Sequence, residues 1–338
     1  AAWWRDFARD VLRLFILVAR DEQGTVQGIA PWCVENSPTR GRTVVWLGSG
    51  KVCSDHQSVL AQTHHADAVT ESLASWLNET ADDANHGWDL LQLDAVATGD
   101  PVMDRLISHL WSDGHTVHRS PGPNCWRIEL PSTWEDYIGT LSKSHRKQVR
   151  RFERRQLDCG RATFHFVEEE DDVDRGMEIL ADLHQRRRQS LGQPGCFADS
   201  SFAAFMRQVA RDMLRAGGLR LCWIEIERTP AAVEFQLAGG TVTYAYQAGV
   251  NPDLLDDEPG RIINIASIRA SIEHGHTGFD FLRGDEPYKA HWRATPRATK
   301  NYRIVPQRTL AQARHGLWLA GDSFKSWVKT GLDLTGMR

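Results

Sequence analysis

The sequence predicts an α/β protein made of two halves, each a mixed sheet flanked by helices. Short apolar segments rich in β-branched and aromatic residues alternate with amphipathic helical segments along the whole chain of 338 residues. The order of these segments also repeats. A hairpin, a third strand, a helix and a further strand occur in residues 1–131 and again in residues 132–308. The halves share this order, although their sequence identity is negligible.

The first half begins inside a predicted helix, so we expect upstream residues to be missing from the sequence. Its hairpin is predicted at Leu14–Ala19 and Val26–Val34, with Gly24 in the turn. The other predicted elements are strands at Thr43–Leu47, Asp89–Leu93, His115–His118 and Trp126–Leu130, and helices at Ala66–Thr80 and Pro101–Ser112. The strands at His115–His118 and Trp126–Leu130 are expected to close the first sheet.

The second half starts after Pro131-Ser132-Thr133, where Ser or Thr would cap a long helix at Trp134–Arg155. Its hairpin is predicted at Leu219–Glu227 and Ala231–Leu237. The other predicted elements are strands at Thr163–Glu168, Thr241–Val250, Phe279–Leu282 and Asn301–Val305, and helices at Val173–Ser190, Phe202–Ala216 and Arg261–His274. Asn301–Val305 is expected to close the second sheet, and residues 309–338 to form a helical tail.

The composition is that of an ordinary globular protein. A net charge of −4 and a pI of about 6.4 give no global reason to bind nucleic acid. The six cysteines form no C-x-x-C pair and the histidines show no metal-ligand spacing, so no metal site is expected. No apolar run approaches the roughly 20 residues of a transmembrane helix. We therefore expect a reducing, cytoplasmic location, with peripheral association at the inner membrane left open.

A glycine-opened helix follows the strand that ends at Val250, through Glu258-Pro259-Gly260-Arg261. A helix N-terminus offers free N–H groups and a partial positive charge, which suit a pyrophosphate. The residues that would contact such a group are Val250, Gly260, Arg261 and Ile262. The same residues also fit a plain Pro–Gly turn before a packed helix.

A cluster of ionisable residues accompanies the next strand. Asp280 lies inside the apolar strand, and Asp285, Glu286, Tyr288 and Lys289 come soon after it. Transfer of an activated acyl group needs a base, an oxyanion donor and a proton donor for the leaving group, and these residue types supply those roles. Asp280 fits a structural role equally well, as a buried carboxylate bonded to backbone N–H groups.

Glu234 interrupts an apolar strand. Alternation puts Val233 and Phe235 on one face of the strand and Glu234 on the other. The carboxylate therefore faces either a substrate cleft, where it would be a general base, or solvent at the edge of the sheet. Tyr246 alternates in the same way on the next strand, and we expect it to line that cleft.

Two basic segments are candidates for binding an anionic group. The first is the end of a helix that carries His184, Arg187 and Arg188, because a guanidinium binds phosphate or carboxylate at two points. The second is residues 143–155, with seven Lys or Arg against one acid. This surface would suit phosphorylated sugars, anionic lipid headgroups or the acceptor arm of a tRNA. Solvated helix surfaces carry such charges too, so a purely structural interpretation remains for both segments.

Together these motifs resemble a known family. The glycine-opened helix followed by Phe279-Asp280-Phe281-Leu282, Gly284 and Tyr288-Lys289 is similar to the pattern of GNAT-type acyltransferases. It resembles in particular the CelD-like polysaccharide-biosynthesis group, a distant relative of the Fem-type aminoacyltransferases. The resemblance implies a duplicated GNAT-like fold whose active site lies in the second half. It also implies that Lys289 lies near the reacting carbonyl, as a Lys after an aromatic residue does in Fem-type enzymes.

The resemblance further implies a reaction. An acyl group would pass from acyl-CoA or an acyl carrier protein thioester to an amine or hydroxyl of a sugar or cell-envelope precursor. Acyl-CoA would then be a co-substrate, and no tightly bound cofactor is expected. Two alternatives stay open: transfer from aminoacyl-tRNA, as in the Fem-type enzymes, and a non-catalytic module that binds glycans or partner proteins.

Overall fold

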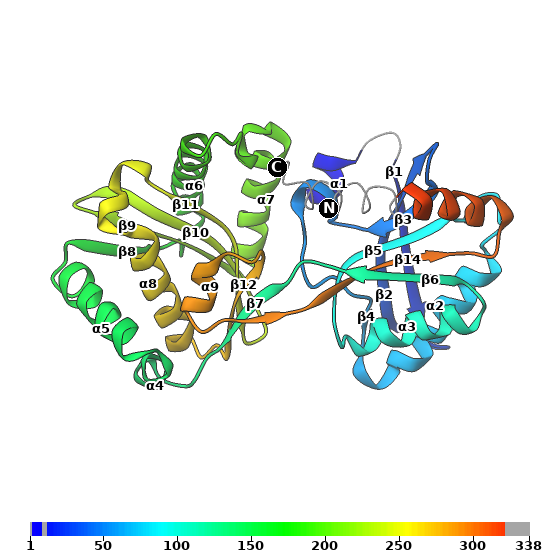
Figure 1. The fold of residues 1–338 in the computed structure, drawn as a ribbon, viewed down its shortest axis with the longest axis horizontal. Helices are drawn as coiled ribbons and strands as arrows, with labels where there is room; N and C mark the ends of the chain where they lie inside the picture. Colours follow the sequence, from blue (N-terminus) through cyan, green and yellow to red (C-terminus); the bar gives the residue numbers. More distant parts are fainter. Residues whose placement is uncertain (1, 9–11, 322–338) are drawn as a thin grey trace, which may run out of the picture. The chain divides into compact units, whose positions relative to one another are not determined.

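Two separate sheets organise the chain, one in each of two units (Figure 1). The structure is a computed structural model that describes residues 2–8 and 12–321. The N-terminal unit comprises the described residues from 8 to 122 together with residues 298–321, and the C-terminal unit comprises residues 2–7 and 123–297. Each unit has a mixed sheet, flanking helices and its own apolar core. This arrangement confirms the predicted duplicated α/β fold.

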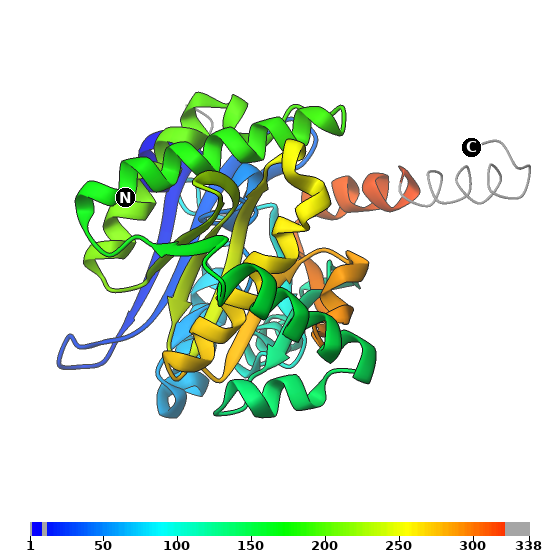
Figure 2. The ribbon, with the colours of Figure 1, turned by 90° about the vertical axis from the view of Figure 1, so that its left-hand side faces the viewer.

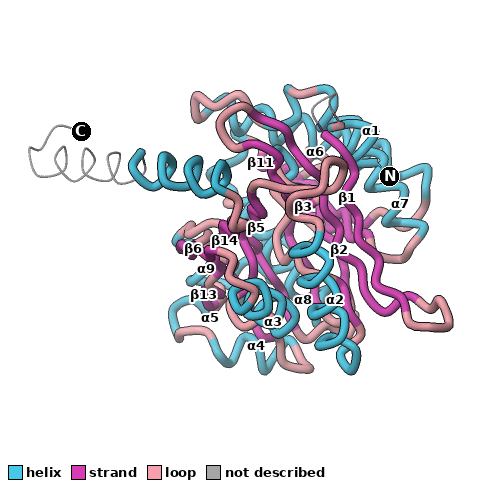
Figure 3. The backbone as a smooth tube through the Cα atoms, turned by 90° about the vertical axis from the view of Figure 1, so that its right-hand side faces the viewer, coloured by secondary structure: helices cyan, strands magenta, loops and turns pink. Residues whose placement is uncertain are grey.

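The sheet of the N-terminal unit has the strand order β1-β2-β3-β5-β14-β6, with the short β4 paired to β2. Its strands are β1 (Leu12–Arg20), β2 (Val26–Ser37), β3 (Gly41–Trp46), β4 (Leu60–Ala61), β5 (Leu90–Ala97), β6 (Thr116–Pro121) and β14 (Thr299–Val305). Only β3 and β5 pair in parallel among these described strands. The chain between them includes α2 (Ala66–Glu79), which packs beside α3 (Pro101–Ser112) against the core (Figure 3).

The sheet of the C-terminal unit has the order β13-β7-β12-β11-β10-β9-β8. Its strands are β7 (Cys125–Glu129), β8 (Ala162–Phe166), β9 (Leu219–Ile226), β10 (Thr229–Gly239), β11 (Val242–Val250), β12 (Gly278–Arg283) and β13 (Thr295–Arg297). β11 and β12 are parallel and are joined by α8 (Pro259–Glu273). Each unit thus has three antiparallel strands followed, through a helix, by a parallel fourth. This is the repeat that the order of elements predicted.

Helices cover both faces of the second sheet (Figure 2). α4 (Trp134–Thr140), α5 (Lys143–Phe152) and α8 share one core with side chains such as Ile224 and Phe279. On the other face lie α6 (Glu170–Ser190) and α7 (Ser200–Arg215). Gly176 allows the approach of α6, since a Cβ there would lie 2.8 Å from Leu221. The remaining elements of this unit are the helices α1 (Ala2–Phe7) and α9 (Pro287–His291), and the single turns Cys196–Ala198 and Pro252–Asp257.

The two sheets exchange one strand each, which the sequence analysis did not predict. β7, expected to close the first sheet, pairs with β12 and β13 in the second. β14, expected to close the second sheet, lies between β5 and β6 in the first. The chain therefore crosses between units after residues 7, 122 and 297, and not once near residue 131. An alternating apolar pattern predicts a strand but not its partner, which is why the exchange was missed.

The long helix expected at Trp134–Arg155 is also wrong in detail. Thr133 caps α4 as predicted, but Leu141 and Ser142 are extended and separate α4 from α5. Ser142 begins a new helix because its side chain accepts a hydrogen bond from the His145 N–H. A π-turn at Glu153–Leu157 then ends the segment. The break matters for function, since it directs the first turn of α5 toward the cavity described below.

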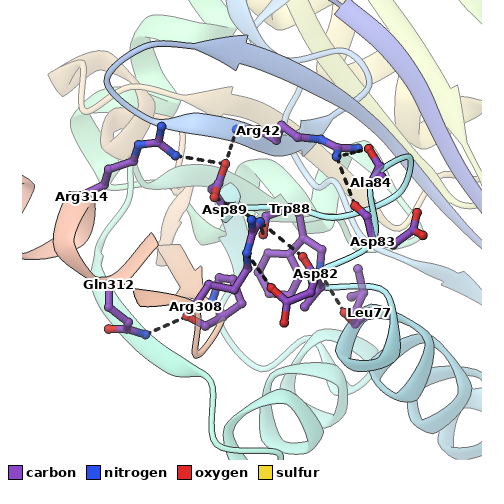
Figure 4. A network of polar contacts seen from close by, with 12 residues as sticks. Arg42, Leu77, Asp82, Asp83, Ala84, Trp88, Asp89, Arg308, Gln312 and Arg314 are labelled. Carbon is purple, nitrogen blue, oxygen red and sulfur yellow. Dashed lines mark hydrogen bonds and ion pairs between the residues drawn. The ribbon is translucent and has the colours of Figure 1, made fainter. Parts of the chain in front are cut away.

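Residues 309–321 form a helix, red in Figure 1, that packs on the N-terminal unit. Ala311 contacts Leu90 and Val305. The buried carboxylate of Asp89 pairs with Arg308 at 3.3 Å and Arg314 at 3.2 Å (Figure 4). The described part of the predicted tail is therefore helical and belongs to the N-terminal unit. The rest of that prediction, residues 322–338, lies outside the described residues.

Candidate active site

A cavity of about 620 Å³ lies within the C-terminal unit. Its walls come from seven elements: α5, α6, β10, β11, the segment Pro252–Asp257, α8 and α9. Eight of the residues proposed from the sequence line it: His184, Arg187, Arg188, Glu234, Val250, Gly260, Arg261 and Tyr288. The predicted base, the predicted anion ligands and the glycine-opened helix therefore share one cavity.

The cavity lies where the parallel strands β11 and β12 separate. β11 and β12 pair only from Val242↔Gly278 to Tyr244↔Asp280, after which β11 continues without β12. β11 also carries a bulge, because Phe235 pairs with Gln247 and Gln236 with Ala245. Tyr246 is the extra residue of that bulge. The strand then approaches α6 closely at Gly249, where a Cβ would lie 2.6 Å from the backbone nitrogen of His184.

Glu234 is the buried carboxyl group of the cavity. It is 6% exposed, and burial raises its pKa above the usual value, while hydrogen bonds from Gln236 and Ser267 act in the opposite direction. A carboxyl with a raised pKa is a better base once ionised and lies nearer to working pH. Of the two positions that the sequence left open for Glu234, the structure places it in the cavity wall and not at a solvent-exposed edge.

Tyr288 stands across the cavity on α9. Burial, together with the carboxylates of Glu234 and Glu286, raises the pKa of Tyr288, so the phenol keeps its proton at neutral pH. Its ring contacts Phe281 edge-on, with centroids 5.6 Å apart. Glu234 and Tyr288 line the same cavity. One is suited to take a proton and the other to give one.

The end of α6 forms a cationic wall. His184 Nδ1 donates to the Ala248 carbonyl at 2.9 Å, and burial lowers the pKa of His184, so the ring is neutral. Its Nε2 atom lies 3.3 Å from Cys196 Sγ. Arg188 is held by Gln193 at 2.8 Å. Arg187, from the same turn, also lines the cavity, so two guanidinium groups are available to an anionic substrate.

The start of α8 is a less open anion site than the sequence suggested. Pro259 has no N–H, and the N–H groups of Arg261 and Ile262 both donate to the Glu258 carbonyl, at 2.9 and 3.3 Å. Glu258 adopts a left-handed backbone at φ 53°, and its side chain pairs with Arg261 at 2.8 Å. An anion here would therefore depend on the Arg261 side chain and the Gly260 N–H more than on a row of free amides.

Glu286, a member of the ionisable cluster, also lines the cavity. Other lining residues were not proposed from the sequence as part of the site: His145, Glu258, Asn264, His291 and Trp292. The ring of His145 contacts the rings of His291 and Trp292 in tilted geometry, at centroid distances of 4.8 and 5.0 Å. A signal for His145 was present, since it shares a helical stripe with the buried Val149 and Phe152. A histidine on such a stripe lies inside the protein and not on the basic surface.

Several proposed residues lie outside the cavity lining. Asp280 is buried and accepts a hydrogen bond from the Leu282 N–H at 2.7 Å. This contact fits the structural role that the sequence left open beside the catalytic one. Asp285 accepts from Trp126 at 2.9 Å and Asn124 at 3.1 Å, and these bonds lower its pKa. Tyr246 and Ile262 are likewise not among the lining residues.

Lys289 also differs from expectation. The sequence pattern predicts a reacting group next to Tyr288, but the side chain of Lys289 is only 2% exposed. Its ammonium donates to the carbonyls of Leu282, Arg283 and Gly284 at 3.2, 2.9 and 3.0 Å, and pairs with Glu286 at 2.9 Å. Lys289 thus closes the turn that precedes α9. It stabilises the turn that positions Tyr288 and Glu286, and it is not itself among the lining residues.

Neither a metal cluster nor a spanning helix is found in the described chain. No group of three or more His, Cys, Asp or Glu within residues 2–8 and 12–321 could hold a metal ion. Over the same residues, no helix combines the length and the apolar character that crossing a bilayer requires.

Comparison with known proteins agrees with this geometry. Residues 143–290 match the family described as "Acetyltransferase (GNAT) domain". That segment includes the cavity lining except His291 and Trp292. Residues 143–290 of the C-terminal unit are therefore similar to a GNAT acetyltransferase domain. No curated protein matches the chain.

Solved structures with the same fold have very different sequences. FemX superimposes with a TM-score of 0.63 at 10% identity, covering 89% of this chain and 90% of that chain. The C-terminal domain of a putative lysylphosphatidylglycerol synthetase from Agrobacterium fabrum superimposes with a TM-score of 0.53 at 11% identity, covering 88% of this chain and 86% of that chain. L-PGS from Bacillus licheniformis superimposes with a TM-score of 0.50 at 10% identity, covering 90% of this chain and 87% of that chain. At such identities these likenesses show the fold alone.

Proposed function

We propose that this cavity is the active site of an acyltransferase that moves an acyl group from a thioester to an amine or hydroxyl. The observation that carries the proposal is the pairing of Glu234 with Tyr288 in one cavity, inside the segment that matches the GNAT domain. Burial raises the pKa of Glu234, which makes its carboxylate a stronger base, and the phenol of Tyr288 stays protonated, so it has a proton to give.

The two groups divide the proton transfers. The acceptor nitrogen or oxygen attacks the thioester carbon, and Glu234 takes its proton as the new bond forms. The carbon–sulfur bond then breaks, and Tyr288 gives its proton to the leaving thiolate. Lys289, Asp280 and Asp285 hold the surrounding turn and strand in place in this scheme.

We propose acyl-CoA, or an acyl carrier protein with its phosphopantetheine arm, as the donor. Arg187, Arg188 and Arg261 supply the positive charge for its phosphates. For the acceptor we propose a sugar or cell-envelope precursor, in line with the resemblance to CelD-like proteins. Coenzyme A at a hundredfold excess over its Kd should raise the free energy of unfolding by about 2.7 kcal/mol.

A thiol-release assay tests the reaction. Acyl-CoA thioesters of increasing chain length are offered with glucosamine as the amine acceptor. Glu234→Gln and Tyr288→Phe should each lower kcat by roughly 10²–10⁴, because each removes one proton-transfer group. Glu227→Gln, an exposed carboxylate outside the cavity, is the matched control. If Glu234→Gln turns over as fast as the wild type, the proposed base is wrong.

Transfer from aminoacyl-tRNA remains the second candidate, favoured by the outer face of α5. Lys143, Lys147 and Arg151 are exposed there, on the helix whose inner face brings His145 to the cavity. Binding of tRNA should then weaken as salt rises, with a slope that falls when these residues become Gln. Equal tRNA binding by the wild type and that triple variant would exclude this role for α5.

A further inference from the structure

Two buried polar atoms of the cavity wall have no hydrogen-bond partner among the residues that the structure describes. They are His145 Nε2, on α5, and Asn264 Oδ1, on α8. The side chains are buried, with His145 5% and Asn264 8% exposed. Buried polar atoms are nearly always hydrogen-bonded, so a pair of them in a cavity wall points to something that binds there.

Both atoms are acceptors. Asn264 Nδ2 lies 2.6 Å from the Gly260 carbonyl, and a carbonyl oxygen can only accept, so the amide orientation is fixed and Oδ1 is the remaining atom. The other ring nitrogen of His145 is engaged in a hydrogen bond with the backbone of His291. Burial, with His291 and Arg261, lowers the pKa of His145. A neutral ring that donates through one nitrogen accepts through the other.

A ligand that satisfies these atoms must donate hydrogen bonds. A pyrophosphate at neutral pH offers only acceptors, so the proposed donor phosphates satisfy neither atom. Hydroxyl groups do, because each carries a proton to donate. His291 and Trp292 lie beside His145 and provide flat ring surface for the apolar face of a sugar. Arg261, one helical turn before Asn264, lies at the same end of the cavity.

We propose that His145 and Asn264 form a polyol subsite, which recognises the hydroxyl groups of a sugar ring. That ring could be supplied by two sources: the acceptor itself, or the ribose of a nucleotide-bearing donor. The role of the bound ring rests on the acyltransferase proposal above, but the binding does not.

Binding of defined probes tests the subsite. D-glucose represents the acceptor ring and adenosine the nucleotide ribose, with 2′,3′-dideoxyadenosine as the control that lacks the hydroxyls. Each is titrated by NMR against the full chain. Asn264→Leu and His145→Phe each remove an acceptor and should weaken the bound probe about tenfold. Asn264→Asp keeps acceptor oxygens and should retain binding. Thermal melts establish whether each variant is folded. If Asn264→Leu does not fold, the binding measured with His145→Phe tests the subsite.

The outcomes separate the sources and the two proposals. Glucose binding that both variants weaken assigns the subsite to the acceptor. Adenosine binding that is lost in the dideoxy analogue assigns it to the donor. The inference is overturned if neither probe binds, if the variants bind as tightly as the wild type, or if a crystal soaked in glucose shows no hydroxyl on either atom. Glu234→Gln should bind the probes normally, so loss of turnover with intact binding bears on the reaction alone.

Discussion

The side-chain oxygen of Asn301 accepts a hydrogen bond from the backbone N–H of Ala95, at 2.9 Å. Ala95 lies in β5 with a left-handed backbone at φ 54°, where the pairing between β5 and β14 shifts register. The Asn301 side chain therefore satisfies an N–H group that the irregular ladder cannot. This bond joins residues that are 206 positions apart in the sequence. It lies where β14 completes the N-terminal sheet.

Asn301→Ala should destabilise the N-terminal unit. It leaves the buried N–H of Ala95 unpaired, which costs about 1–3 kcal/mol. Urea unfolding measures the change. Asn301→Asp keeps the acceptor oxygen and should recover much of the loss. Should Asn301→Ala unfold at the same urea concentration as the wild type, the bond has no structural importance.

A fragment of residues 8–122 should not fold alone. It contains β5 and β6 but not β14, which lies between them. Without that strand, two strands expose unpaired backbone groups and the core loses Tyr302 and Ile304. Circular dichroism should show a disordered fragment, and a linked segment of residues 298–321 should restore the fold. A cooperative melt of the fragment alone would contradict the exchange.

Lys289→Ala should lower stability as well as activity. The buried ammonium serves three carbonyl groups and Glu286, so its loss should cost about 2 kcal/mol or more. Thermal melts of Lys289→Ala and of Lys143→Ala, an exposed lysine, provide the comparison. If Lys289→Ala abolishes turnover while its melting temperature is unchanged, Lys289 is a reacting group, as the sequence pattern first suggested.

The raised pKa of Glu234 has a predictable effect on stability. Between its ordinary value of 4.5 and its raised value, the folded state holds a proton that the unfolded state has lost. The free energy of unfolding should therefore fall as pH rises through that window. Glu234→Gln lacks the titrating group and should show a smaller decrease. Urea unfolding of both proteins across this range measures the difference, and identical pH profiles would contradict the raised pKa.

Cys196 should react slowly with iodoacetamide, despite its contact with His184. Burial raises the pKa of the Cys196 thiol to about 11 from 9.0, which lowers the thiolate fraction at pH 7 about a hundredfold. The neutral His184 ring accepts from the thiol and does not supply a positive charge. Mass spectrometry should find label on the exposed Cys53 and Cys159 first. Early labelling of Cys196 would indicate an activated nucleophile.

Much of the site could be predicted because local patterns determine it. Strand alternation alone places Glu234 opposite Val233, and the order strand–helix–strand brings Gly260 and Tyr288 to the same end of the sheet. The position of Lys289 could not be predicted in this way. Its ammonium turns back to the Leu282 carbonyl because Leu282 adopts a left-handed backbone, at φ 57°. No periodicity in the sequence carries that information.

The same limit explains the strand partners. Both β7 and β14 have the apolar alternation of a strand, and both were recognised as such. Which sheet each joins depends on contacts between segments that are far apart in sequence, such as Tyr302 in β14 against Leu93 in β5. Local propensity does not encode such a choice, because it is made by packing in the folded core.

The strand exchange also sets an order of events during protein synthesis. Residues 12–122 of the N-terminal unit leave the ribosome before residues 123–297 of the C-terminal unit, yet the N-terminal sheet lacks an inner strand until residue 305 has emerged. Nascent domains usually fold as they appear, from the N-terminal end. Here the N-terminal unit must wait, with unpaired edges on β5 and β6, until residues 123–297 of the other unit have been made. Chaperones that shield nascent strands should therefore matter more to the N-terminal unit than to the C-terminal unit.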